Sequence, residues 1–272
     1  MKKLLFIAVM VITLQAVNAQ QKQGTVNYQR KTNTWKIIQN DEIRSRVPEF
    51  QISKYILFFS DSLSMYKLIP DDNAPEPFSD GGGGFRRFNF GGGDGELYKN
   101  FTIGLSTQAT ELGGKNFLIV DTIKKAPWKI SAETKQILGI NCRKATRKVL
   151  QPVRQQRSFN FNNNNNIPRD TTKPAPKEIE VVAWFAETIL APVGPDSYGQ
   201  LPGVILELNV DGGTTVYTAT DLKQTVDAKE LKEPKKGKKV TRQEYVQLQR
   251  ELLQNQGGGG GGQIIIRGGP GG

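Results

Sequence analysis

Short β-prone segments separated by turn residues run through most of the chain, and this pattern constrains the fold more than any other feature. The segments cover residues 24–32, 50–60, 63–69, 97–103, 116–123, 142–150, 179–187, 203–210 and 214–220. Turns such as Asp211-Gly212-Gly213 join neighbouring segments, and no helical crossovers separate them. We therefore expect a mainly β fold built on a single curved antiparallel sheet. An open half-barrel, by analogy with periplasmic lipoprotein carriers, is one form of it.

One C-terminal helix is expected after the strands. Thr241 and Glu244 have the spacing of a capping box, with Thr at the N-cap and Glu three positions later. Tyr245, Leu248 and Leu252 follow at positions i, i+3 and i+7, which places them on one helical face. We expect this helix to lie on the sheet.

Three low-complexity segments interrupt or follow the β-prone part. Residues 71–95 are Gly-rich, residues 158–178 contain five consecutive Asn, and residues 255–272 contain six consecutive Gly. These segments lack the apolar density needed to offset the entropy lost on ordering. We expect two Gly/Asn-rich loops inserted in one β domain over residues 20–254, and a flexible Gly-rich tail over residues 255–272.

The first nineteen residues have the three parts of a secretory signal peptide. Lys2 and Lys3 precede an apolar run over residues 4–14, and Val17 and Ala19 occupy the −3 and −1 positions. No Cys follows the cleavage site, so a lipoprotein is not expected. The prediction is a periplasmic or otherwise exported protein, with no transmembrane segment after cleavage.

The composition excludes several kinds of active site. The chain has 37 Lys+Arg, 26 Asp+Glu, no His and one Cys, for a net charge of +11. Without His there can be no Ser-His-Asp triad, and no His-ligated metal site. One Cys rules out an internal disulfide or a multi-cysteine metal cluster. We predict no cofactor, no metal site and a buried, unreactive Cys142.

One motif carries a family resemblance. The string GPDSYGQLPGVILE (residues 194–207) resembles the signature of the GLPGLI family, GP..(Y/F)GGLPGLILE, with Gln200 and Val204 as departures. Supporting strings lie upstream: WKI at 128–130, KQILGINCRKA at 135–145 and AWF at 183–185. The resemblance covers about residues 24–226. It implies an exported envelope protein of Bacteroidota, from a family that is largely uncharacterised.

The same motif has a physical interpretation. Proline fixes φ, and glycine allows backbone conformations that other residues avoid. The motif should therefore form a rigid loop that leads into a strand and sets its register. The residues with this structural role are Gly194, Pro195, Gly199, Pro202, Gly203 and Glu207. The alternative is a binding role for Tyr198 and Leu201 at a rim of the sheet.

Few other residues suggest chemistry. Trp184 and Phe185 point to opposite faces of a strand, so at least one should lie in the core, and Trp184 is a third candidate for ligand binding. Glu187, Asp196 and Glu207 could supply paired carboxylates for hydrolysis. Nothing in their spacing singles them out, so no catalytic residue is predicted.

Two clusters combine basic residues with turns or aromatics. The first is Lys235, Lys236, Lys238, Lys239 and Arg242, and the second interleaves Arg86 and Arg87 with Phe85, Phe88 and Phe90. In an exported protein, anionic lipid headgroups or lipopolysaccharide are better partners for them than nucleic acid. A simply solvated basic surface is the plainest interpretation.

Three functions fit these observations. The first is a non-enzymatic envelope protein that binds an apolar ligand or another envelope protein, and a deep apolar cavity would favour this function. The second is a carboxylate-dependent hydrolase, which needs two convergent carboxylates. The third is an accessory subunit of an outer-membrane transport or secretion complex, which would present a flat surface without a cavity.

Overall fold

The protein is organised around one twelve-stranded sheet. The structure, a computed structural model, describes residues 21–38, 40–70, 95–125, 127–151 and 175–256. The strands are β1 (Gly24–Asn33), β2 (Phe50–Phe59), β3 (Leu63–Ile69), β4 (Leu97–Asn100), β5 (Leu105–Leu112), β6 (Lys115–Thr122), β7 (Lys129–Ile137), β8 (Ile140–Gln151), β9 (Lys177–Ala186), β10 (Val204–Val210), β11 (Thr215–Lys223) and β12 (Lys238–Val240). Their order across the sheet is β12-β6-β5-β4-β3-β2-β1-β11-β10-β9-β8-β7.

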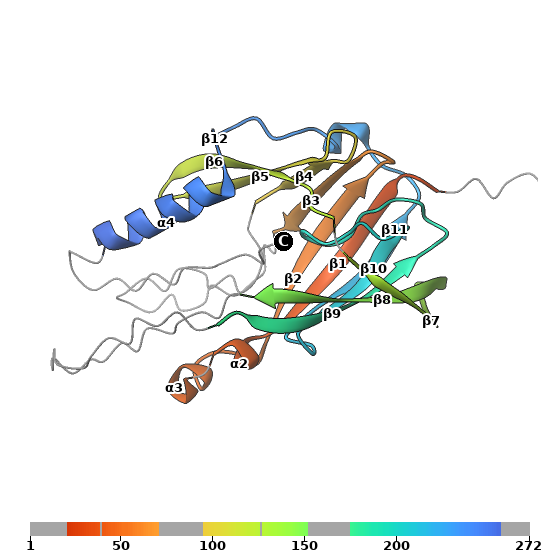
Figure 1. Ribbon diagram of the computed structural model, residues 1–272, viewed down its shortest axis with the longest axis horizontal. Helices are drawn as coiled ribbons and strands as arrows, with labels where there is room; N and C mark the ends of the chain where they lie inside the picture. Colours follow the sequence, from red (N-terminus) through yellow and green to blue (C-terminus); the bar gives the residue numbers. More distant parts are fainter. Residues whose placement is uncertain (1–20, 39, 71–94, 126, 152–174, 257–272) are drawn as a thin grey trace, which may run out of the picture.

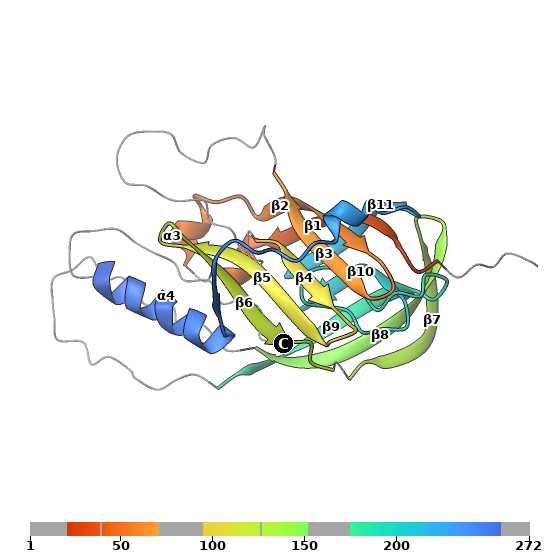
Figure 2. The ribbon, with the colours of Figure 1, turned by 90° about the horizontal axis from the view of Figure 1, so that it is seen from above.

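The sheet is antiparallel at every pairing except β12 with β6, which is parallel. It is strongly curved but does not close, because β12 and β7 stand at opposite edges (Figures 1 and 2). The expected mainly β fold with a single curved antiparallel sheet is confirmed. Strands that follow each other across a turn pair antiparallel, as β2 does with β3 and β10 with β11, and β8 pairs with β9 on either side of residues 152–174.

The short helices lie at the ends of the sheet. They are α2 (Thr34–Ile37), α3 (Asp41–Arg44), the 3-10 helix η1 (Ala228–Glu230) and α4 (Arg242–Gln256). Figure 1 shows α2 and α3 beyond one end of β1 and β2, and α4 beside β6 and β12. None of the helices in the described part of the chain has the length and apolar content needed to cross a bilayer.

The C-terminal helix begins as the sequence predicts. The Glu244 backbone N–H donates to Thr241 Oγ1 at 3.2 Å, and the Thr241 N–H donates to Glu244 Oε2 at 2.7 Å. Together these bonds form the capping box. The Tyr245 ring packs edge-on against Phe117 of β6, with ring centroids 5.9 Å apart. The helix therefore docks on the outermost long strand of the sheet through its first turns.

The core covers one face of the curved sheet. On β1, Val26, Tyr28 and Arg30 are buried, and each alternates with a more exposed residue, as strand geometry requires. The register aligns Tyr28 with Tyr55 of β2 and with Ala219 of β11, so these side chains share the core face. Burying large apolar side chains of this kind stabilises the fold by about 1.5–3 kcal/mol each.

Three strands were not among the sequence predictions. They are β5, β7 and β12, and all three are rich in polar residues. The strands β7 and β12 are edge strands that bury little surface, so their sequences carry no apolar alternation. The expected segment 97–103 is also too long, because β4 ends at Asn100 in a turn.

Several predictions fall on residues outside the described ranges. These are the signal peptide at residues 1–19 and most of the three low-complexity segments. Their borders can be compared with the strands and helices. Strand β9 begins at Lys177, inside the segment expected as loop, and α4 extends to Gln256, past the expected start of the tail.

Candidate functional site

The family-like motif forms a plug on the core face of the sheet. Residues 187–203 leave β9 and return to β10, and we call this segment the plug. An isolated antiparallel bridge joins Val193 to Gly199, and the Gln200 N–H donates to the Pro192 carbonyl at 2.8 Å. The Ile205 N–H donates to the Val193 carbonyl at 3.0 Å. The plug thus has backbone hydrogen bonds of its own, and a further backbone hydrogen bond joins it to the start of β10.

Two glycines of the motif are required by close backbone approach. A Cβ on Gly203 would lie 2.0 Å from the Ala186 carbonyl oxygen, a distance that real Cβ atoms do not reach. Gly199 has φ of +153°, and a Cβ there would lie 2.7 Å from the Pro192 carbonyl oxygen. Only glycine fits either position without a backbone shift. These contacts agree with the structural role predicted for the motif.

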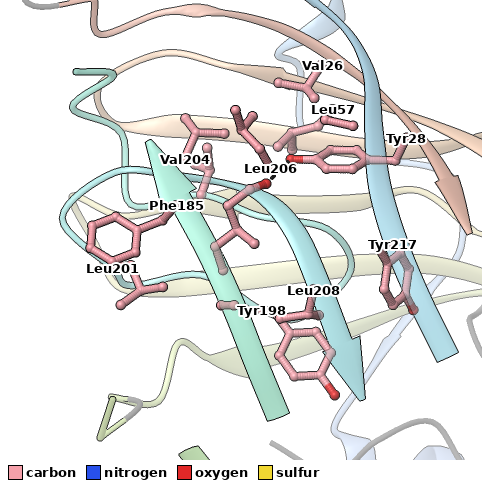
Figure 3. Close-up of a cluster of buried hydrophobic side chains, with 14 of the residues drawn as sticks. Val26, Tyr28, Leu57, Phe185, Tyr198, Leu201, Val204, Leu206, Leu208 and Tyr217 are labelled. Atoms are coloured by element: carbon pink, nitrogen blue, oxygen red, sulfur yellow. Dashed lines mark hydrogen bonds between the residues drawn. The ribbon is translucent and has the colours of Figure 1, made fainter. Parts of the chain in front are cut away.

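The two plug residues for which a binding role at a rim was the alternative are buried. Tyr198 is 4% exposed and Leu201 is 2% exposed, and both belong to the main core cluster (Figure 3). Burial raises the pKa of Tyr198 to about 12. In this conformation neither side chain is available to a ligand arriving from solvent. The carbonyl of Ile205 accepts a 2.6 Å hydrogen bond from the Tyr28 hydroxyl, which ties the motif strand to β1 (Figure 3).

A buried lysine and a partly buried arginine hold the plug against the sheet. Lys99 of β4 is 7% exposed, and its ammonium donates to the backbone carbonyls of Asp196 at 2.7 Å and Tyr198 at 3.2 Å. Burial lowers the pKa of Lys99 to about 8, and the Asp196 carboxylate partly offsets this effect. The Arg147 guanidinium lies 5.0 Å from the Tyr198 ring centroid and 4.8 Å from that of Trp128.

Trp128, from the first of the supporting strings, also contacts the plug directly. Its indole N–H donates to the Gly199 carbonyl at 2.9 Å. Stacking of a guanidinium on two aromatic rings is worth about 0.5–2 kcal/mol per contact. The first supporting string, at residues 128–130, and the signature string, at residues 194–207, are therefore in contact, although about seventy residues separate them.

A small polar pocket lies between the plug and the sheet. Arg30 is 1% exposed, and its guanidinium lies 4.9 Å from the Tyr55 ring centroid. The Tyr55 and Tyr66 rings are stacked, with centroids 4.9 Å apart. The Tyr217 hydroxyl donates to Asp196 Oδ2 at 3.4 Å. The residues lining the pocket are Arg30, Tyr55, Tyr66, Gly95, Leu97, Gln108, Asp196 and Tyr217.

This pocket is too small for an apolar ligand. The space open to the centre of a water-sized molecule is about 10 Å³, which matches roughly one water. Burial raises the pKa of both Tyr66 and Tyr217 well above the usual value, so both phenols stay neutral at physiological pH. The pocket can therefore offer hydroxyl groups and one guanidinium to a small polar group.

Trp184 takes a different position from the plug residues. Its ring is partly exposed on the outer face of the sheet, whereas its neighbour Phe185 is fully buried, as predicted for opposite faces. The Lys135 ammonium lies 4.5 Å from the Trp184 ring centroid and binds Glu207 Oε1 at 2.6 Å. The aromatic face is thus already covered by a lysine held in an ion pair.

The three candidate carboxylates do not converge. Glu187 pairs with Arg143 at 2.9 Å, Glu207 pairs with Lys135, and Asp196 lies in the polar pocket. The described residues contain no group of three or more Asp, Glu or Cys side chains placed to hold a metal ion. Cys142 is fully buried, as predicted, and burial raises the pKa of its thiol to about 11.

The sequence did not point to the cations under the plug. Arg30 and Lys99 sit at core-facing positions of otherwise apolar alternation, beside Tyr28 and Leu97 respectively. A charged residue at such a position is the signal that could have identified them, because a buried charge requires a partner. The partners are not visible in the sequence, because Lys99 bonds two backbone carbonyls of the plug and Arg30 lies over the Tyr55 ring of the neighbouring strand.

These observations define a curved, open antiparallel sheet whose core face is occupied by a rigid plug. Residues 128–207 match a family model described as a protein of unknown function (Porph_ging). That stretch begins at Trp128 and ends at Glu207, the limits of the motif set described above. No curated protein matches the chain.

Solved structures give a likeness in fold. A structure titled "Structure of PNGF-II in C2 space group" is 16% identical with a TM-score of 0.51, over 85% of this chain and 33% of that one. A second, "Structure of PNGF-II in P21 space group", is 14% identical with a TM-score of 0.49, over 85% of this chain and 34% of that one. The chain spans about a third of the length of these structures, and the first supports the fold alone.

Proposed function

We propose that the chain is a non-enzymatic, exported envelope protein of the GLPGLI type, and that it binds another protein rather than an apolar ligand. The observation that carries this proposal is the filled core face of the sheet. An open half-barrel carrier would hold its ligand on this face. Here the plug occupies that space with Tyr198 and Leu201, which are at most 4% exposed. The described residues form a water-sized polar pocket and a groove beside β12.

An exterior apolar patch offers a surface for such a partner. Phe50 and Ile52 lie two residues apart on the outer face of β2 and are 41% and 55% exposed. The Lys31 ammonium covers one side of the Phe50 ring at 3.9 Å. Trp35 of α2 is 43% exposed and lies near the same end of the strand, where the Thr34 N–H donates to Glu49. Exposed apolar clusters of this kind are typical of protein interaction sites.

The rival functions have less support. A carboxylate-dependent hydrolase needs two convergent acids, and Glu187, Asp196 and Glu207 lie with separate partners. An accessory subunit of a transport or secretion complex is compatible with the proposal, because such a subunit also binds another protein.

Photocrosslinking tests the proposal. A photoreactive residue at position 54, exposed on the same face of β2, should crosslink a protein partner in the producing cell. The double change Phe50→Ser and Ile52→Ser should remove the crosslink. The matched control, Ile103→Ser and Leu150→Ser, removes two apolar side chains elsewhere that are more exposed, at 63% and 66%, and should leave the crosslink. Absence of any crosslink, or one bound lipid per purified molecule, would contradict the proposal.

A further inference from the structure

A row of lysines crosses the segment between η1 and α4. Lys232, Lys235, Lys236 and Lys239 are exposed, and we call these four the lysine ridge. None of the four makes an ion pair with any residue that the structure describes. Part of this ridge was singled out by sequence as a basic cluster, and the proposed protein partner does not use it.

The fold separates the acidic residues of this segment from the lysines. Glu230 pairs with Lys67 of β3 at 2.9 Å, and Glu233 accepts a 2.8 Å hydrogen bond from Thr107 of β5. Both carboxylates are therefore tied to the sheet. The lysines between and after them carry the outward charge.

Two basic neighbours do not belong to the ridge. Arg242 pairs with Asp121 at 3.3 Å, so it is separated from the cluster that the sequence suggested. Lys238 faces Glu244 closely enough to help the Thr241 hydrogen bonds lower the pKa of that carboxylate. The ridge thus consists of four exposed lysines without an ion pair to a described residue, and one of them, Lys239, shares the groove beside β12 with Glu244 and Glu251.

The C-terminal end of the ridge is fixed to the sheet. Lys238–Val240 form β12, which pairs with β6 in parallel register. Just before it, a Cβ on Gly237 would lie 2.9 Å from the Asn116 carbonyl, so the two backbones are in contact. Lys115, exposed at the start of β6, adjoins this contact and adds a fifth positive charge nearby. Strand pairing therefore holds Lys239 on the sheet, and the contacts of Glu230 and Glu233 hold the chain on either side of Lys232.

We propose that the lysine ridge docks the protein on a membrane surface rich in anionic lipid headgroups. Each Lys near such a surface contributes about 1 kcal/mol of attraction, and the contributions accumulate when the charges face one way. This inference does not depend on the proposed protein partner.

A threaded polyanion fits this surface less well than a flat one. The groove beside β12 is also lined by Glu244 and Glu251, whose carboxylates would repel a phosphate chain lying in it. Binding of single-stranded nucleic acid also draws on aromatic stacking. The exposed large aromatics of the described residues, Trp35 and Phe50, lie on α2 and β2 instead.

The test is cosedimentation of the mature protein with vesicles. Vesicles of equal parts phosphatidylglycerol and phosphatidylcholine are compared with pure phosphatidylcholine, at low and high salt. The ridge variant changes Lys232, Lys235, Lys236 and Lys239 to Gln. The control variant changes four exposed lysines outside the ridge, Lys54, Lys125, Lys129 and Lys223, to Gln, so that both variants lose the same charge.

We expect salt-sensitive binding to the anionic vesicles alone, weakened by up to roughly 1,000-fold in the ridge variant and by less than about 5-fold in the control. Equal weakening in the two variants would overturn the proposal, because binding would then follow net charge alone. Failure of the wild-type protein to bind anionic vesicles would also overturn it. So would a ridge variant that loses affinity for a DNA oligonucleotide but keeps its vesicle binding.

Discussion

The Lys99 ammonium donates a 2.7 Å hydrogen bond to the backbone carbonyl of Asp196, joining β4 to the plug across 97 residues of sequence. The same ammonium reaches the Tyr198 carbonyl at 3.2 Å. A lysine can donate three hydrogen bonds, so one buried side chain satisfies two carbonyls that the plug could not satisfy alone. The plug is therefore held by the sheet as well as by its own turns.

Replacing this lysine should destabilise the protein. Lys99→Met keeps most of the side-chain volume but leaves the Asp196 and Tyr198 carbonyls without their donor. A buried polar group without a partner costs about 1–3 kcal/mol. We expect urea denaturation to show a loss of about 2 kcal/mol, whereas Lys54→Met, on the exposed face of β2, should change stability by less than about 0.5 kcal/mol. A Lys99→Met protein as stable as wild type would show that the plug does not depend on this contact.

The pH dependence of stability should also report on Lys99. Its pKa is lowered from 10.5 to about 8 in the folded protein by burial. Below pH 8 both states hold the proton, so the contribution is constant. Between pH 8 and 10.5 the unfolded chain binds more protons, and the stability from Lys99 therefore rises with pH.

The measurement is the difference in unfolding free energy between wild type and Lys99→Met, followed from pH 7 to about pH 9.5. The buried tyrosines oppose this trend. Their pKa values are raised in the folded protein, so as the pH rises their phenols ionise first in the unfolded chain, which lowers the stability of the folded state. Both proteins share them, so their effect cancels in the difference. A difference that stays flat or shrinks with pH would contradict the assignment.

Gly203 should tolerate no side chain. Its added Cβ would lie 2.0 Å from the Ala186 carbonyl oxygen, which is backbone and cannot rotate away. Gly203→Ala should therefore cost about 2–4 kcal/mol in thermal or urea unfolding. The matched control is Gly212→Ala, in the β10–β11 turn, where nothing lies within 4 Å and only the positive φ of +59° opposes the change. Similar losses in the two variants would show that close approach at Gly203 is not the cause.

The sequence predicted the sheet well because its central strands are buried on one face. Alternation at Val26 and Tyr28 followed directly from that burial. The edge strand β7 escaped prediction because one side of it has no neighbouring strand and most of its residues are exposed. Without burial there is no apolar pattern to detect.

The site was less predictable, for a different reason. The prolines and glycines of the motif predicted a rigid loop, and the close contacts at Gly199 and Gly203 agree with that interpretation. The sequence could not show whether the Tyr198 side chain points toward the core or toward solvent. A Gly- and Pro-rich loop has no regular alternation of apolar and polar residues from which to infer this direction. The contact with Lys99 depends on a long-range approach that no local pattern encodes.

The single cysteine gives a direct probe of the core. Cys142 is fully buried on β8, and burial raises the pKa of its thiol to about 11. The thiolate is the reactive form, so the native protein should react with a disulfide reagent such as DTNB at least about 100-fold more slowly than the same protein in guanidinium. Lys99→Met should speed the native reaction if loosening the plug opens the core around β8 and β9. Rapid labelling of the native wild-type protein would contradict the burial of Cys142, and the guanidinium sample serves as the control for complete reaction.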